Sequence, residues 1–457
     1  MIEGTAAPVE IPSLHAALAW RLAPVGVALG SLALGAIALG SRSLTTAEAA
    51  SLAAADRSFG TVISTVVHDD PGQAGQLLLL RLATTIGSGE RTIRAPSAIA
   101  VALAAGLLVI LGTILLGRLA GVVAGVALAA NAGVVEASRE ARPYALGILG
   151  IVVATLLFLF ALERGGGWRW IAYGIAAALL PLTHPLAAAV LAAHGATLIA
   201  RRDRADLRSA GVALVAGTAV AACLLVWMAA DRFDPLSGSG DLDLSNLGRG
   251  LAGAGGWNPV LAVAAVAGLV FLFREGHASS PDRWVGVLVA TLIAAPFVVT
   301  LLAAVVLPVH VGALVLCSPG VALAAGAAAV ILSPTRGLVA AGLAVLLVAS
   351  AIATTVRLTA QPDEDWRGLA AAVKRVRGPK ETVVVLPEGS RAAFAYYAPY
   401  VSTIRFARGD GAWVAVRAET AGSAIEASRP SVMTPRYALL RQFRYGKRLW
   451  LQHWVRP

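Results

Sequence analysis

Two clusters of charged residues stand out, because the rest of the sequence carries few charges. In the first, residues 68–72 read His-Asp-Asp-Pro-Gly. The carboxylates of Asp69 and Asp70 beside the imidazole of His68 could bind a divalent cation, or remove a proton from a hydroxyl group as a general base. The same residues are also good turn formers, because Asp bonds to its own backbone and Pro-Gly favours a tight turn. Two interpretations therefore stay open, a reactive site and a solvated turn.

The second cluster spans residues 136–144, which read Glu-Ala-Ser-Arg-Glu-Ala-Arg-Pro-Tyr. Arg139 and Arg142 each offer a planar fork of N–H donors that matches phosphate oxygens. A proline followed by Tyr144 is typical of the first turn of a helix. The cluster is either a phosphate site at a helix N-terminus or a set of anchors at a membrane boundary, with Glu140 between the two arginines.

Three histidines lie in or beside long apolar stretches. His184 stands between two prolines, where it either caps a helix end or contacts a ligand. His194 is surrounded by apolar residues, which favours a helix–helix contact. His310 ends an apolar run and is a further candidate cation. The sequence has no Walker loop, no His-Glu-x-x-His and no cysteine pair at metal spacing, which excludes the enzyme classes that these motifs mark.

The composition indicates which elements must position these residues. Of the 457 residues, 58% are hydrophobic and 14% are charged, whereas a soluble globular protein has about 45–50% apolar and about 25% charged residues. Residues 95–117, 209–230 and 284–309 contain no charged side chain. A helix of about 20 such residues crosses the roughly 30 Å hydrocarbon core of a bilayer. The sequence therefore predicts a multi-pass membrane protein.

Apolar run length predicts an all-α polytopic membrane fold with about eleven transmembrane helices. The predicted spans are 20–41, 95–117, 119–135, 143–162, 169–183, 185–200, 209–230, 252–273, 284–307, 309–332 and 337–357. The uncharged run after Arg169 is too long for one span, so we expect a tight helical hairpin with His184 at its tip. Cys223 and Cys317 lie inside apolar spans and are expected to be packing residues.

The net charge of +11 comes from short basic loops and the C-terminal segment. No basic helix alternates with aromatic residues, which excludes a nucleic-acid surface. Basic loops such as 201–208 are typical of the cytoplasmic side of a membrane protein, and the acidic loop 231–249 is then external. This assignment predicts a cytoplasmic N-terminus and places both charged clusters and His184 outside. A full span at 74–88 would reverse it, so we expect an interfacial helix there, within a large external loop at 42–94.

The composition changes after residue 357, where charged residues return. Helical spacing at 365–376 and 392–397, and β-branched or alternating runs at 382–386, 412–417 and 448–455, predict a small α/β domain. The predicted organisation is therefore a transmembrane domain at 1–357 and a soluble extracytoplasmic domain at 358–457.

Several motifs together resemble one family. Residues 138–146 read Ser-Arg-Glu-Ala-Arg-Pro-Tyr-Ala-Leu, residues 94–98 read Arg-Ala-Pro-Ser-Ala, and residues 364–368 read Glu-Asp-Trp-Arg-Gly. In this order they resemble the polyprenyl-phosphate-sugar-dependent membrane glycosyltransferases of the C superfold, which include protein O-mannosyltransferase and aminoarabinose transferase relatives. The resemblance covers nearly the whole chain, and its most specific motif is the run at 138–146.

The resemblance implies that a sugar, with mannose as one candidate, moves from a polyprenyl-phosphate carrier to a glycan or protein acceptor outside the plasma membrane. In such relatives an aspartate of the first external loop deprotonates the acceptor, and basic residues stabilise the charge on the leaving phosphate. The substrate-binding residues that it implies here are His68, Arg139, Glu140, Arg142, Tyr144, His184 and His310.

The first loop departs from the family pattern. Relatives carry Asp-Glu where this chain has Ala47 and Glu48. Glu48, Asp69 and Asp70 are therefore the candidate catalytic bases. The alternative is a catalytically silent relative that binds lipid-linked sugar or a partner protein. A flippase is disfavoured, because the spans are nearly free of charge. The sequence predicts no metal-ligand set and leaves a role for a divalent cation open.

Overall fold

The structure is a computed structural model. It describes residues 14–37, 39–68, 71–201, 207–230, 253, 256, 258–274, 283–306, 311–332, 335–359, 362–432 and 436–457. Asp69, Asp70 and His310, which the sequence singled out, lie outside these residues.

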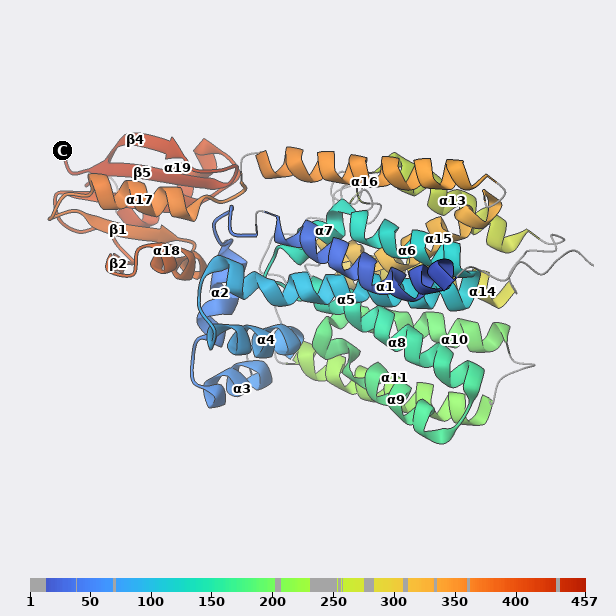
Figure 1. Cartoon of the computed structure of the whole chain (residues 1–457). Coiled ribbons are helices and arrows are strands. Elements are labelled where there is room, and N and C mark those ends of the chain that lie inside the picture. The colour runs from blue at the N-terminus through green and yellow to red at the C-terminus, as the bar shows by residue number, and fades with distance from the viewer. Residues whose placement is uncertain are drawn as a thin grey trace, which may run out of the picture.

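Helices make up most of the described chain (Figure 1). The α-helices are α1 (Leu14–Ala36), α2 (Thr46–Ala55), α3 (Phe59–His68), α4 (Ala74–Thr84), α5 (Glu90–Leu116), α6 (Arg118–Ala130), α7 (Ala132–Ser138), α8 (Tyr144–Arg164), α9 (Gly167–Thr183), α10 (Val190–Ala200), α11 (Leu207–Ala230), α13 (Pro259–Phe273), α14 (Arg283–Val306), α15 (Ser318–Ile331), α16 (Arg336–Thr359), α17 (Trp366–Val376), α18 (Arg391–Tyr397) and α19 (Ala421–Val432). Short 3₁₀ segments are η1 (Pro71–Gln73), η2 (Pro185–Ala189), η3 (Val311–Cys317) and η4 (Glu388–Ser390). The strands are β1 (Thr382–Leu386), β2 (Thr403–Ile404), β3 (Gly411–Arg417), β4 (Ala438–Arg444) and β5 (Leu449–Val455).

Each of the eleven predicted spans contains a helix. By length and composition, five described helices could cross a membrane, or six if one bent pair is a single span. That pair is α6 and α7, which meet at 62°, so the straight span predicted at 119–135 is broken at Asn131. The Asn131 side chain accepts hydrogen bonds from the first N–H groups of α7, which explains why a new helix starts there. The count of eleven spans stays a prediction.

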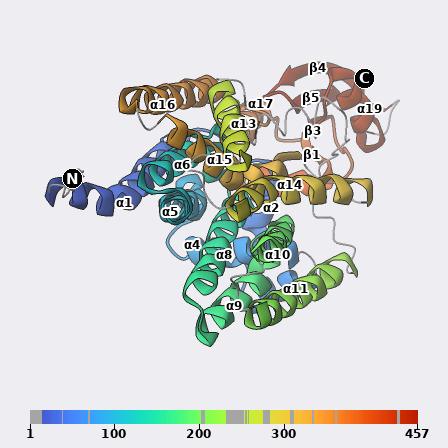
Figure 2. The same ribbon diagram turned by 90° about the vertical axis from the view of Figure 1, so that its right-hand side faces the viewer.

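Small residues let the apolar helices pack closely. A Cβ atom on Gly112 of α5 would lie only 2.8 Å from the Cα atom of Gly121 of α6, so the two backbones touch as membrane helices with glycine interfaces do. Figure 2 shows α13 and α16 on the side of the bundle opposite α9 and α11. The largest buried apolar cluster lies between these two sides and draws on α5, α6, α8 and α15.

The C-terminal part of the chain forms a five-stranded sheet in the order β2-β1-β3-β5-β4. Strand β1 is parallel to both β2 and β3, whereas β5 is antiparallel to β3 and β4. The predicted strands at 382–386, 412–417 and 448–455 and the predicted helices at 365–376 and 392–397 are confirmed within one residue at each end. The sequence did not indicate β2, β4 or α19.

The sheet lies at one end of the helical bundle, next to α2, and α3 and α4 lie at the same end (Figure 1). We call this the sheet end. The first loop and the C-terminal part share one buried apolar cluster there, in which Leu52 and Leu77 occur together with Trp366, Leu369 and Phe394. The two parts are therefore joined by packing as well as by the chain.

Candidate active site

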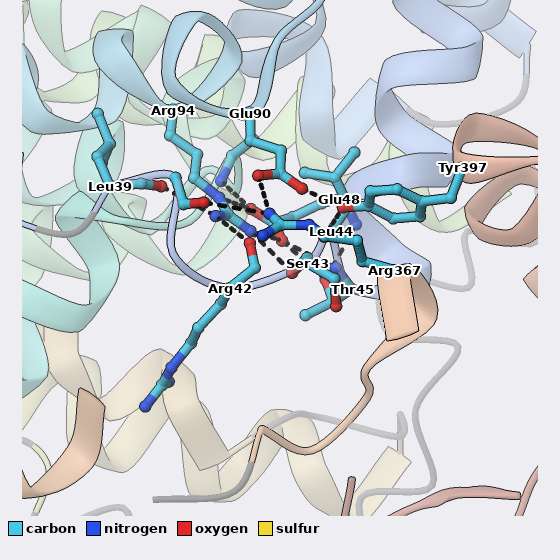
Figure 3. Close-up of polar contacts among 12 residues, drawn as sticks. Leu39, Arg42, Ser43, Leu44, Thr45, Glu48, Glu90, Arg94, Arg367 and Tyr397 are labelled. Atoms are coloured by element: carbon cyan, nitrogen blue, oxygen red, sulfur yellow. Dashed lines mark hydrogen bonds and ion pairs between the residues drawn. The ribbon is translucent and has the colours of Figure 1, made fainter. Parts of the chain in front are cut away.

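An ion pair joins the first loop to α5 (Figure 3). Arg94 Nε donates to Glu48 Oε1 at 2.8 Å, and Arg94 Nη2 donates to Glu48 Oε2 at 2.8 Å. The same guanidinium donates to the backbone carbonyls of Leu39, Arg42 and Ser43 at 3.0, 3.0 and 3.1 Å. All five N–H groups of the arginine are therefore used.

The carboxylate of Glu48 is equally occupied. Its Oε1 atom accepts from the backbone N–H of Ala141 at 2.9 Å, and Oε2 accepts from that of Thr45 at 3.0 Å. Burial opposes the charge, but Arg94 and the backbone donors outweigh it, so the pKa of Glu48 falls below its usual value. The side chain is 0% exposed. This geometry disfavours the catalytic role predicted for Glu48, because an acceptor hydroxyl cannot reach a buried carboxylate that already has its partners.

A second Glu–Arg combination lies next to the first but is unpaired. Glu140 and Arg142 flank Ala141, in the segment that joins α7 to α8, and both are partly buried. Among the described residues neither makes a hydrogen bond or an ion pair. Burial raises the pKa of Glu140 to about 7, in spite of the nearby Arg142. A carboxyl group with this pKa is suited to take up and release a proton near neutral pH.

An aromatic stack adjoins this pair. The guanidinium of Arg142 lies 5.1 Å from the ring centre of Tyr144. The ring of His184 stacks on the same tyrosine, with 5.3 Å between the ring centres. His184 Nδ1 accepts the backbone N–H of Leu186 at 3.2 Å, which leaves the proton of a neutral ring on Nε2. A Cβ on Gly147 would lie 2.9 Å from His184 Cβ, so only glycine permits this approach. The predicted helix start at Tyr144 is confirmed.

Two buried polar groups near this stack lack partners. Within the described part of the chain, Tyr144 Oη is buried and makes no hydrogen bond, and neither polar atom of the Gln76 side chain has a partner, although Gln76 is 0% exposed. A Cβ on the adjacent Gly75 would lie 2.7 Å from the backbone oxygen of Leu182, which brings this turn of α4 close to His184. A buried polar group without a partner costs about 1–3 kcal/mol, so both groups are positioned for a ligand or water.

Arg139 and His68 have other local uses. Arg139 donates from Nη2 to Leu34 O at 2.7 Å and from Nε to Gly35 O at 3.4 Å, which caps the C-terminal end of α1. Burial and the nearby Arg42 lower the pKa of Arg139. His68 is exposed at the end of α3, with Nδ1 3.1 Å from the carbonyl of its own helix. Neither contact joins these residues to the Glu140–Arg142 pair.

Sequence reasoning missed Gln76 as a site residue and treated Arg94 only as part of a family motif. The signal for Gln76 was a polar side chain directly before the apolar run at 77–80, on a helix that also carries Arg81. Among the residues that the structure describes, no three His, Cys, Asp or Glu side chains come together as metal ligands.

A family model supports the resemblance drawn from the motifs. Residues 75–228 match the model of the dolichyl-phosphate-mannose-protein mannosyltransferase family. This range includes Gln76, Arg94, the segment 138–146 and His184. No curated protein matches the sequence.

Solved structures share the fold. The ArnT protein of Cupriavidus metallidurans, bound to undecaprenyl phosphate, superposes with a TM-score of 0.59 over 96% of this chain and 98% of its own, at 14% identity. Its apo state gives the same TM-score at 15% identity. The apo oligosaccharyltransferase of Archaeoglobus fulgidus gives a TM-score of 0.55 at 12% identity, over 85% of this chain and 64% of its own. The chain therefore has the fold of the C-superfold membrane glycosyltransferases, as its motifs implied.

Proposed function

We propose that the protein is a membrane glycosyltransferase that moves a sugar from a polyprenyl-phosphate carrier to an acceptor hydroxyl at the outer face of the plasma membrane. The observation that carries the proposal is the unpaired Glu140–Arg142 combination at the sheet end, beside the Tyr144–His184 stack. The family match over 75–228 and the fold shared with ArnT, which was solved with undecaprenyl phosphate, support it.

In this reaction Glu140 is the base. It takes the proton of the acceptor hydroxyl, whose oxygen attacks the anomeric carbon of the sugar. The bond from that carbon to the phosphate oxygen breaks, and its electron pair leaves with polyprenyl phosphate. Arg142 stabilises the charge that develops on the phosphate, through the bidentate geometry that arginine offers. No covalent intermediate with the protein is needed, because a positioned acceptor reacts directly.

Other residues complete the proposed site. Tyr144, His184 and Gln76 contact the donor through their unpartnered groups, and the remaining Nη1 group of Arg139 adds a contact to phosphate. Asp69 and Asp70 are kept as alternative bases, and His68 and His310 as further donor contacts.

The proposed topology has eleven spans and a cytoplasmic N-terminus. Residues 1–357 form the membrane body, with an external loop at 42–94, and residues 358–457 form an α/β unit on the outer side. Mannose is the first donor sugar to test, because the matched family model is named for it. The acceptor is a glycan or a protein of the cell envelope.

A second candidate function is a silent relative that binds lipid-linked sugar without transferring it. Ala47 favours this candidate, because it lies exposed on α2 at the position where relatives carry an aspartate.

An assay with purified protein separates the two functions. Labelled polyprenyl-phosphate mannose is supplied with membrane acceptors, and transfer is followed for wild type, Glu140→Gln and Glu426→Gln. We expect Glu140→Gln to slow transfer by about 10²- to 10⁴-fold, whereas Glu426→Gln, an exposed glutamate on α19, has no effect. Full activity of Glu140→Gln would contradict the assigned base. Donor binding without turnover, with every polyprenyl-phosphate sugar tried, would favour the silent relative.

A further inference from the structure

The segment that follows β1 in the C-terminal sheet contacts α2. Strand β1 has β2 on one side and β3 on the other, and all three are parallel. In open α/β sheets the crevice at the carboxyl ends of two such strands, where the winding reverses, is where ligands bind. Here Arg417 ends β3, and Ser390 follows β1. Both of them contact other residues of the same chain, Arg417 through Glu364 and Ser390 through Thr46.

Glu364 connects this edge to the first residue of α2. Its Oε2 atom accepts from the backbone N–H of Thr46 at 2.8 Å and from Thr46 Oγ1 at 2.6 Å. Its Oε1 atom lies 2.7 Å from Arg417 Nε, and Thr46 Oγ1 lies 3.5 Å from Ser390 Oγ. Glu364 is 6% exposed. A buried carboxylate at the N-terminus of a helix satisfies a free N–H and interacts favourably with the helix dipole.

A second set of contacts, drawn in Figure 3, also joins the first loop to the C-terminal part of the chain. The hydroxyl of Tyr397 accepts the backbone N–H of Leu44 at 2.7 Å and donates to Glu90. Arg367 pairs with the same Glu90 and donates to Gly40 O at 3.1 Å. The chain just before α2, and the start of α5, are thus attached to α17 and α18.

We propose that the C-terminal unit is a clamp, formed by Glu364, Ser390 and Arg417, that positions α2 for the transfer reaction. Glu364 is the positioning residue. It fixes the first turn of α2, which also carries Glu48. Glu48 in turn accepts from the backbone N–H of Ala141, which lies between Glu140 and Arg142. The clamp therefore sets the orientation of Glu140 and Arg142 without touching substrate. This inference rests on the proposed function for its effect on transfer.

Hydrogen exchange and transfer rates of the full-length protein test the clamp. In Glu364→Gln the carboxylate that bonds to Thr46 and pairs with Arg417 is lost. We expect the amides at 46–52 to exchange about fivefold faster, because a carboxylate at a helix N-terminus contributes about 1 kcal/mol through the helix dipole, although the N-cap Thr45 is kept. The maximal transfer rate falls by a similar factor, whereas the KM for the donor stays unchanged. The matched control is Glu419→Gln, which removes the exposed ion pair with Arg448, 3.0 Å long, in which no residue of α2 takes part.

A reversible cross-link separates positioning from folding. The variant Thr46→Cys/Ser390→Cys is made in a Glu364→Gln, Cys223→Ala background, so that oxidation joins α2 to the sheet edge. We expect oxidation to restore slow exchange at 46–52 and transfer, and reduction to remove both. Unchanged exchange in Glu364→Gln would overturn the clamp, and so would a cross-link that slows exchange without restoring transfer. Hydrogen exchange is measured without donor and therefore does not depend on transfer. If the wild type transfers no sugar, the proposed function is wrong, and the exchange result still tests the clamp.

Discussion

The two Glu–Arg combinations at the sheet end are made from the same residue types and lie side by side, yet they are used differently. Glu48 and Arg94 are buried, and every N–H group of the arginine side chain donates to the carboxylate or to one of three backbone carbonyls. Glu140 and Arg142 lie on either side of Ala141, which bonds to Glu48, and have no such partners among the residues that the structure describes. Within the described part of the chain, contacts with each other and with backbone groups, and not residue type, therefore distinguish the paired combination from the unpaired one.

The largest loss of stability is expected when the ion pair between Glu48 and Arg94 is removed. Arg94→Ala leaves the carboxylate of Glu48 buried without its charge partner, which costs about 3–5 kcal/mol of unfolding free energy. Denaturant unfolding in detergent measures this loss. The control is Arg448→Ala, whose partner is the exposed Glu419, and there we expect a loss of about 0–1 kcal/mol. Equal losses in the two variants would contradict the structural role of the buried pair.

The second prediction concerns how the transfer rate depends on the protonation of Glu140. Because the carboxylate form of Glu140 is the proposed base and its pKa is about 7, activity is low when the group is protonated. We therefore expect the transfer rate to rise about tenfold between about pH 6 and about pH 8 and then to level off. A rate profile of wild type beside Glu140→Gln measures this, since the weak residual activity of the variant should lack the step. The same step in both proteins would assign it to another group.

The smallest change in stability is expected at Tyr144. Its hydroxyl is buried without a partner, so Tyr144→Phe should leave stability unchanged or raise it by about 1 kcal/mol. If the hydroxyl meets the donor, the KM for the donor should rise about three- to tenfold, the equivalent of one hydrogen bond. Tyr437→Phe is the opposite case, because that hydroxyl donates to Gly409 O at 3.0 Å and its removal should lower stability. Thermal unfolding and donor kinetics distinguish these outcomes.

Much of the fold could be predicted from the sequence, because it depends on local patterns. Uncharged runs indicated where helices lie, and the β-branched run at 382–386 coincides with β1. Strand β4 could not be predicted because it is an edge strand, exposed along most of its length and without apolar alternation. Helix α19 lacks a continuous apolar face and contains Pro430, which argues against a helix until the neighbouring strands are known.

The candidate site was only half predictable. The residue types at 138–146 indicated the right segment, and its helix start at Tyr144 was correct. The use of Glu48 could not be inferred, because its partners Arg94 and Ala141 lie 46 and 93 positions away in the sequence. The same holds for Gln76, whose importance comes from having no partner after the chain has folded.

The apolar cluster shared by the first loop and the C-terminal part has a consequence for biosynthesis. Ser43 donates to the backbone oxygen of Glu364, a contact across 321 positions. The ribosome therefore synthesises the first loop long before the residues that pack against it, such as Trp366 and Phe394. Until the last hundred residues have been translated, Leu52 and Leu77 lack their final neighbours, and the nascent protein depends on its early helices alone. A chain that stops after α16 would insert all its long helices and still never complete the layer above them.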